Sequence, residues 1–187
     1  MEISCIILAG GKSKRLGKDK AFIKISGKCM INYVIDEVEK IFDDIVVVVK
    51  NEEQKKKISN KSINIICDNQ KINSPIIGIK EGIKHIKNNY FFVVACDMPF
   101  IKSEAIEKLI SNLEDYECIV PKRGYKKYEP LFAIYKKNVF RNCDANQSMH
   151  KIIDNCKNSK LISIEKLSKD KKIFYNINSE EDLKFNF

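Results

Sequence analysis

Short, almost uninterrupted apolar segments alternate with segments of helical periodicity along the chain, and this alternation restricts the possible folds more than any other feature. The apolar segments have the length of single strands and show no strict polar–apolar alternation. Continuous apolar runs of this kind are typical of parallel strands that are buried on both faces. We therefore predict strands at residues 3–9, 44–50, 63–68, 90–97, 117–121, 130–136, 160–165 and 174–177.

Between these runs, apolar residues recur every three or four positions, as on the buried face of an amphipathic helix. Ser103 is expected to cap the start of one helix, and Ser179 and Asp182 have the spacing of a capping box near the end of the chain. Strands that alternate with helices predict an α/β fold, in which right-handed crossovers place helices on both faces of a mainly parallel sheet. Helices are predicted at 29–42, 75–87, 103–113, 146–156 and after Ser179.

The length and the cysteines indicate one domain without a disulfide framework. The chain has 187 residues, enough for a single core, so we predict one domain over 1–187. It has seven cysteines but no C-x-x-C pair, and Cys5, Cys67 and Cys96 lie inside apolar runs, where cysteine behaves as a small hydrophobic residue. The two histidines have no partner at metal-ligand spacing, so we expect no zinc site.

Charge and hydropathy argue against nucleic-acid and membrane partners. The net charge is +9, but the lysines are spread along the chain and form no basic block with interleaved aromatic residues. No apolar run approaches the roughly 20 residues that cross a bilayer. The first apolar run has no basic leader and ends in a glycine loop rather than a cleavage site. We therefore expect a cytoplasmic protein.

The stretch "ILAGGKSKRLGKDKAFIKI", which begins at Ile7, leads from the first predicted strand into a basic glycine loop. Gly10 and Gly11 let backbone N–H groups approach an anion closely, and Arg15 and Lys20 add positive charge. Arginine is scarce in this lysine-rich chain, and its forked guanidinium suits bidentate contact with phosphate. The spacing fits neither a Walker loop nor the G-x-G-x-x-G dinucleotide fingerprint. The loop therefore predicts a phosphate site of another kind.

Two aspartates end predicted strands. Asp97 closes the run at 90–97, and Asp68 closes the run at 63–68. Ligands of open α/β sheets bind outside the carboxyl ends of the strands, and Mg²⁺ prefers one or two carboxylates together with phosphate oxygens and water. Alone, either aspartate is equally well explained as a turn residue. Together with the glycine loop, they predict a nucleoside triphosphate held with magnesium.

The segment "LAGGKSKRLGKDK" at 8–20 resembles the signature of the nucleotidyltransferase superfamily, and within it the chain resembles the molybdenum cofactor guanylyltransferases of the MobA family. Further similarity lies in Asp68 followed by "SPIIGIKEGI", and in "ACDMPF", "EPLFAIY" and "NINSEEDL". The resemblance implies a single three-layer α/β/α domain with a Rossmann-like, mixed but mainly parallel sheet, as in nucleotide-diphospho-sugar transferases. It also implies a Mg²⁺-dependent transfer of GMP from GTP to the molybdenum-molybdopterin cofactor.

The resemblance assigns roles residue by residue. Catalytic roles would fall to Arg15, Lys20 and Asp97, of which Asp97 would also bind the metal. The pterin would lie beside Asn176 and Asn178. GTP would be bound by Leu8, Ala9, Gly10, Lys20, Asn51, Asp68 and Asp97.

Alternatives remain open at this point. A cytidylyltransferase for the same cofactor tends to carry Ala-Ala-Gly where this chain has Ala9-Gly10-Gly11. Ser74 replaces a glycine of the family pattern, and the bulkier Ile77 replaces an alanine near the expected base pocket. A nucleotidyltransferase for a sugar phosphate or a cobalamin precursor would keep the fold, and a nucleotide-sensing or cofactor-binding module would lack turnover. The implied partners are GTP, the molybdopterin cofactor and the upstream molybdopterin-inserting protein.

Overall fold

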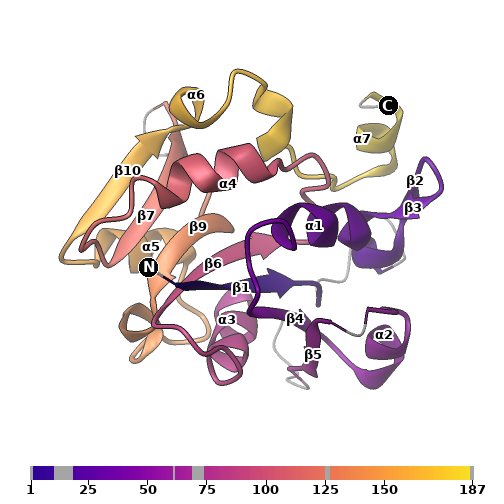
Figure 1. Ribbon diagram of the computed structural model, residues 1–187, viewed down its shortest axis with the longest axis horizontal. Helices are drawn as coiled ribbons and strands as arrows, with labels where there is room; N and C mark the ends of the chain where they lie inside the picture. Colours follow the sequence, from indigo (N-terminus) through magenta and orange to yellow (C-terminus); the bar gives the residue numbers. More distant parts are fainter. Residues whose placement is uncertain (1, 11–18, 61, 69–73, 125–126, 186–187) are drawn as a thin grey trace.

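The computed structural model describes residues 2–10, 19–60, 62–68, 74–124 and 127–185. Within these ranges, one eight-stranded sheet of order β10-β7-β9-β6-β1-β4-β5, with β8 beside β7, forms the middle of the molecule (Figure 1). Its strands are β1 (Ile3–Leu8), β4 (Ile45–Val49), β5 (Asn64–Cys67), β6 (Tyr90–Ala95), β7 (Cys118–Arg123), β8 (Lys127–Tyr128), β9 (Phe132–Lys136) and β10 (Ser159–Ser163). A separate hairpin consists of β2 (Lys24–Ile25) and β3 (Lys28–Cys29).

The sheet is mainly parallel. β1 pairs in parallel with β4 and β6, β4 with β5, and β7 with β10. In the described part of the chain, β9 runs antiparallel between β6 and β7, and the short β8 runs antiparallel to β7. The predicted α/β fold with a mixed, mainly parallel sheet is therefore confirmed.

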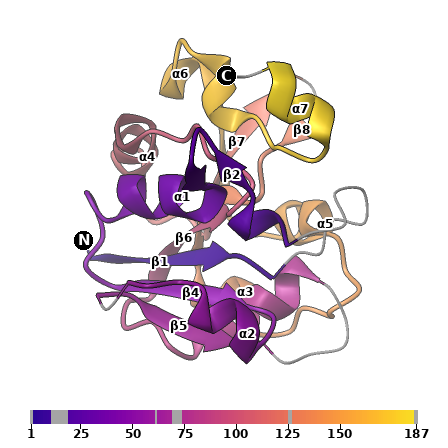
Figure 2. The same ribbon diagram turned by 90° about the vertical axis from the view of Figure 1, so that its right-hand side faces the viewer.

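Helices cover both faces of the sheet and complete three layers (Figures 1 and 2). α1, α4 and α6 pack on one face, and α3 and α5 pack on the other. None of the described helices has the length and apolar character that a membrane span requires. The helices are α1 (Met30–Val38), α2 (Glu52–Lys56), α3 (Pro75–Ile83), α4 (Ser103–Ile110), α5 (Met149–Asp154), α6 (Ile164–Leu167) and α7 (Glu180–Phe185), with 3-10 helices η1 (Lys20–Phe22), η2 (Lys137–Phe140) and η3 (Lys171–Phe174).

Strand β4 shows why the central strands have continuous apolar sequences. Val47 and Val49 belong to the core shared with α1 and α4, whereas Val46 and Val48 belong to the core shared with α3. Successive side chains of a strand point to opposite faces of the sheet. Because both faces are covered here, every position of the strand must be apolar.

Two local predictions are wrong. Residues 174–177, predicted as a strand, instead form the last residue of η3 and the irregular segment after it, where Phe174 and Ile177 are buried by packing. Ser103, predicted as a helix cap, is the first residue of α4, and Lys102 occupies the cap position. The N–H of Ser103 donates to Glu37 Oε2 at 2.8 Å, so a residue distant in sequence provides the acceptor that a local cap would have supplied.

The close packing of α3 on β1 gives a test of the core. A Cβ atom at Gly82 would lie 2.9 Å from both Cδ1 and Cγ2 of Ile6, whose side chain is fully buried. Cγ2 is attached directly to Cβ and moves only with χ1, and a buried β-branched side chain has few other χ1 rotamers to adopt. We expect Gly82→Ala to lower the free energy of unfolding by about 1–3 kcal/mol, measured by urea denaturation.

Gly78→Ala is the matched control, because it is the same change in the same helix. Its added Cβ would lie 3.0 Å from Cδ2 of Leu8, which is the far end of a flexible side chain. Leu8 can adjust, and alanine favours the helix over glycine by about 1 kcal/mol, so the net cost should be smaller. Equal costs at the two positions would contradict this account of how α3 packs.

Candidate functional site

The parallel strands bring the predicted site residues to one edge of the sheet. β1 and β6 are in register from Ile3 opposite Tyr90 to Leu8 opposite Ala95, so the chain leaves both strands side by side. A cavity of about 230 Å³ lies at this edge. The described residues that line it are Leu8, Gly10, Lys20, Val48, Asp68, Ser74, Pro75, Gly78, Ala95, Cys96, Asp97 and Leu131.

Lys20 and Asp97 form an ion pair in the wall of this cavity. Lys20 begins η1, and Asp97 follows the end of β6. Lys20 Nζ lies 3.0 Å from Asp97 Oδ2, and the two side chains are only 14% and 20% exposed. The same ammonium donates to Asn178 Oδ1 at 2.6 Å. A single lysine therefore joins the central sheet to the C-terminal part of the chain.

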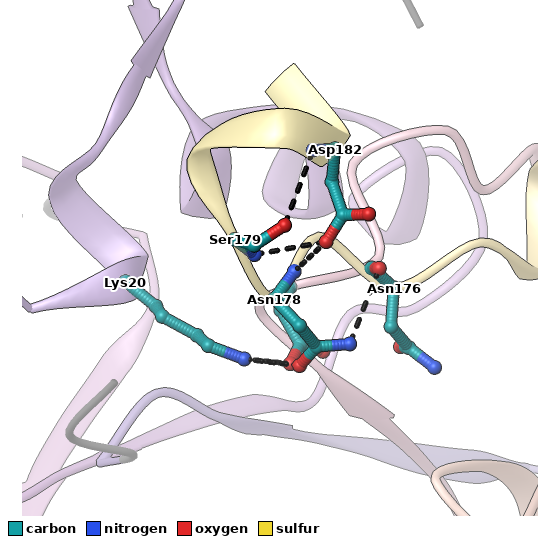
Figure 3. Close-up of polar contacts among 6 residues, drawn as sticks. Lys20, Asn176, Asn178, Ser179 and Asp182 are labelled. Atoms are coloured by element: carbon teal, nitrogen blue, oxygen red, sulfur yellow. Dashed lines mark hydrogen bonds and ion pairs between the residues drawn. The ribbon is translucent and has the colours of Figure 1, made fainter. Parts of the chain in front are cut away.

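The segment that follows η3 runs past Asp97 and carries both predicted pterin-side residues. The N–H of Ile177 donates to the carbonyl oxygen of Asp97 at 2.9 Å. Asn176 and Asn178 line a larger groove, of about 680 Å³, together with Arg123, Tyr128, Glu129 and Tyr175. Lys20 lines the first cavity and Asn178 lines the groove, so the hydrogen bond between them joins the walls of the two (Figure 3).

The start of α7 fixes this segment through a capping box. Ser179 Oγ accepts the N–H of Asp182 at 3.3 Å, and Asp182 Oδ2 accepts the N–H of Ser179 at 2.8 Å. These reciprocal bonds confirm the capping box that the sequence predicts. Asp182 Oδ2 also accepts the N–H of Asn178 at 2.7 Å. That bond is the main cause that lowers the pKa of Asp182 below its ordinary value.

Asp68 lines the cavity from the end of β5, beside a lysine that the sequence analysis missed. Its Oδ1 lies 3.1 Å from Lys50 Nζ, and the side chains of Asp68 and Lys50 are only 9% and 15% exposed. Gly10 lies next to this pair, since a Cβ added there would be 3.7 Å from Asp68 Oδ2 and 3.6 Å from the backbone nitrogen of Lys50. The only signal for Lys50 in the sequence is its place directly after a buried strand.

Asn51, predicted to contact a nucleoside, caps α2 in the structure. Its Oδ1 accepts the N–H of Gln54 at 2.9 Å, and Gln54 Oε1 accepts the N–H of Lys50 at 2.8 Å. Gln54 is almost fully buried, and Asn51 is not among the described residues that line the cavity. This network fixes Lys50 beside Asp68. A direct contact between Asn51 and a nucleoside stays a prediction.

Some backbone N–H and C=O groups at the end of β1 form hydrogen bonds with neighbouring strands. The carbonyl of Leu8 accepts the N–H of Cys96 at 3.0 Å, and the N–H of Ala9 donates to the carbonyl of Val48 at 2.8 Å. Leu8 and Gly10 line the cavity, whereas Ala9 is buried and absent from its described lining. A backbone contact of Leu8, Ala9 or Gly10 to a nucleotide stays a prediction. Arg15, the remaining predicted site residue, lies outside the described residues.

The described lining of the cavity offers charged groups for an ionic ligand rather than a reactive nucleophile. Cys96 lines it, but burial raises the pKa of this thiol and the nearby Asp97 raises it further, so the thiol stays protonated near neutral pH. Among the described residues, no group of three or more His, Cys, Asp or Glu side chains could hold a metal ion. A carboxylate and an ammonium side by side can bind phosphate oxygens and a hydrated divalent cation together.

This chain is similar to known proteins in both sequence and structure. Residues 5–160 match the family described as MobA-like NTP transferase domain. A protein of Natranaerobius thermophilus named "Probable molybdenum cofactor guanylyltransferase" is 37% identical over 97% of this chain and 93% of its own length. A protein of the same name from Methanocaldococcus jannaschii is 35% identical over 97% and 96%. The crystal structure of molybdopterin-guanine dinucleotide biosynthesis protein A from Archaeoglobus fulgidus has a TM-score of 0.81 at 27% identity, over 97% of this chain and 95% of that one.

The Lys50–Asp68 pair gives a prediction that needs no ligand. Lys50→Met removes the cation from a carboxylate that is only 9% exposed. We expect the free energy of unfolding to fall by about 1–3 kcal/mol, the cost of leaving a buried polar group without this partner. The double variant Lys50→Met/Asp68→Asn should recover part of the loss, because it removes both charges and leaves no carboxylate without its ammonium. Denaturant unfolding at neutral pH measures both effects.

Lys84→Met serves as the control, since it removes one partner of Glu81 at the end of α3, where the lysine is 64% exposed. An exposed pair is worth about 0–1 kcal/mol. If Lys50→Met costs no more than Lys84→Met, the buried pair is not a structural part of the cavity wall.

Proposed function

This chain belongs to the MobA-like NTP transferase family, and on that premise we propose that it transfers GMP from GTP to the molybdenum-molybdopterin cofactor. The products are molybdopterin guanine dinucleotide and pyrophosphate. The proposal is supported by relatives whose names state this activity and whose sequences match this chain over nearly their whole length. The structural observation that carries it is the Lys20–Asp97 pair, which lines the smaller cavity while its partner Asn178 lines the larger groove.

In this proposal the guanosine part of GTP occupies the cavity of about 230 Å³, and its phosphates reach Lys20. Asp68 offers carboxylate oxygens that can accept N–H groups of the guanine ring or hydroxyl groups of the ribose. A site that pairs such groups rejects a ligand that leaves its buried polar atoms unpaired. Ile77, the bulkier residue near the expected base pocket, is not among the described residues that line the cavity.

Asp97 is the residue that we assign to Mg²⁺. Its carboxylate follows the end of β6, is 20% exposed and lies beside the Lys20 ammonium. One carboxylate fits this ion, because Mg²⁺ takes its other ligands from phosphate oxygens and water. When bound, the ion would neutralise the charge that develops on the phosphates during transfer.

The acceptor phosphate of the pterin would approach from the groove, where Asn176 and Asn178 lie. One of its oxygens forms a bond to the α-phosphorus of GTP, and the bond from that phosphorus to the α–β bridging oxygen breaks, so pyrophosphate leaves with the electron pair. The attacking oxygen is already anionic, so the reaction needs no general base. Lys20 holds the phosphates in line and offsets their charge, and Arg15 would add to the same effect.

Two other functions are compatible with this cavity. A CTP-dependent or other small-molecule nucleotidyltransferase would use the same phosphate groups with another base or acceptor. A nucleotide-sensing or cofactor-binding module would bind the nucleotide without transferring it. The upstream molybdopterin-inserting protein remains a proposed partner, and the acceptor is the substrate that it would supply.

The base preference can be tested with a nucleotide panel. With the molybdenum-molybdopterin cofactor and Mg²⁺ present, GTP should support pyrophosphate release with a kcat/KM at least about 100-fold above that for CTP or ATP. Equal rates with CTP would make the guanine assignment wrong but leave nucleotidyl transfer standing. Tight GTP binding without any pyrophosphate release would instead identify a binding module.

The ion pair can be tested by substitution. Asp97→Asn should keep the fold and lower kcat at least about 100-fold, because it removes the charge that the metal site needs. Lys20→Ala should weaken GTP binding by about 1.5–3 kcal/mol, the worth of a charge-assisted contact, measured by calorimetry. Lys24→Ala is the matched control, since Lys24 is an exposed lysine on the neighbouring β2. Near-normal turnover in folded Asp97→Asn, or equal binding by both lysine variants, would overturn these roles.

A further inference from the structure

Donors from Tyr175, Asn178 and Ser179 converge on the carboxylate of Asp182. Its Oδ2 accepts the backbone N–H of Asn178 at 2.7 Å and of Ser179 at 2.8 Å, and its Oδ1 accepts the hydroxyl of Tyr175 at 3.0 Å. Figure 3 shows the Asp182 carboxylate facing the Asn178–Ser179 backbone, while Lys20 reaches Asn178 from another part of the chain. Both oxygens of Asp182 are therefore used to hold the segment that leads into the site.

The side chain of Asn178 is held at both of its polar ends. Its Oδ1 accepts from Lys20 Nζ at 2.6 Å, and its Nδ2 donates to the carbonyl of Asn176 at 3.3 Å. The amide can make both bonds in only one orientation, with its oxygen toward Lys20. Lys20 Nζ is also 3.0 Å from Asp97 Oδ2, so the ammonium is fixed between two oxygens.

A helix cap does not explain all of these bonds. A capping box consists of the two reciprocal bonds between Ser179 and Asp182. The bond from Asn178 N–H lies outside that motif, and at 2.7 Å it is shorter than the two bonds of the capping box. It links Asp182 through one residue to the ammonium of Lys20, which lines the proposed nucleotide cavity.

We propose that Asp182 is a positioning residue for the transfer step, which fixes the Lys20 ammonium through Asn178. The inference rests on the proposed function, because it assigns Lys20 to the phosphates of GTP. Without the carboxylate, the backbone of Asn178 and Ser179 loses its acceptor, and Asn178 no longer holds Lys20 in one place. Asp182 lines the groove and not the nucleotide cavity, so the cavity itself stays intact. Lys20 keeps its charge and can still meet the phosphates of GTP, but no longer in one fixed place, so the loss should appear in kcat more than in KM for GTP.

Three variants separate positioning from capping. Asp182→Asn weakens the bonds to Asn178 and Ser179, and we expect kcat to fall about tenfold while KM for GTP changes by less than about twofold. Ser179→Ala removes the hydroxyl that caps the N–H of Asp182 but keeps the carboxylate and its three donors. Its kcat should stay within about twofold of the wild type. Asp182→Glu keeps the charge and should restore most of the rate lost in Asp182→Asn.

A measurement without substrate accompanies the kinetics. The side-chain amide signals of Asn178 in ¹⁵N–¹H NMR should shift when Lys20→Met removes the ammonium. Asp182→Asn should shift them in the same direction, and Ser179→Ala should leave them in place. Thermal unfolding of each variant establishes that it is folded.

Equal kcat values and equal Asn178 signals in Asp182→Asn and Ser179→Ala would show that Asp182 is only a helix cap, and would overturn the inference. A wild-type protein that releases no pyrophosphate would overturn the proposed function. In that case the NMR comparison still decides whether Asp182 fixes Asn178 against Lys20.

Discussion

The parallel pairing of β1 with β4 and β6 is the constraint on which the candidate site depends. It places the residues that follow these strands, together with Asp68 after β5, at one edge of the sheet. The strands are buried on both faces, so a shift of one residue would exchange Ile6 and Ile7 between the two cores. The same packing that stabilises the fold therefore sets the distances between Gly10, Asp68 and Asp97.

The two lysines at this edge have different surroundings. Lys50 is held by a partly buried network that runs from the Asn51 cap through Gln54, and its ammonium faces Asp68. Lys20 instead lies between Asp97 and a residue from the C-terminal segment. A cation held by a distant segment is placed by the whole fold rather than by its own helix. We infer that Lys50 shapes the cavity wall, whereas Lys20 is arranged to meet the phosphates.

Much of the fold was readable from the sequence, because a two-sided parallel sheet requires continuous apolar strands and amphipathic helices. The Ser179–Asp182 capping box was predictable for a similar reason, since both of its partners are local. The β2–β3 hairpin was missed. Ser26 and Gly27 form its turn and both have positive φ, as in a tight hairpin turn. The only sign of it in the sequence is the Ser-Gly pair, which marks many turns. Lys50 was missed because its partner, Asp68, follows a different strand. The pattern of residues along one segment does not show which residues of another strand lie beside it.

The central claim is that the edge formed by Lys20, Asp68 and Asp97 holds GTP and its metal ion. A crystal structure with Mn²⁺ and a GTP analogue that cannot be cleaved at the α–β bond tests it most directly. We expect an anomalous manganese peak at the Asp97 carboxylate, phosphate oxygens on Lys20 and the guanosine beside Asp68. Manganese bound away from Asp97, or a nucleoside outside this cavity, would contradict it.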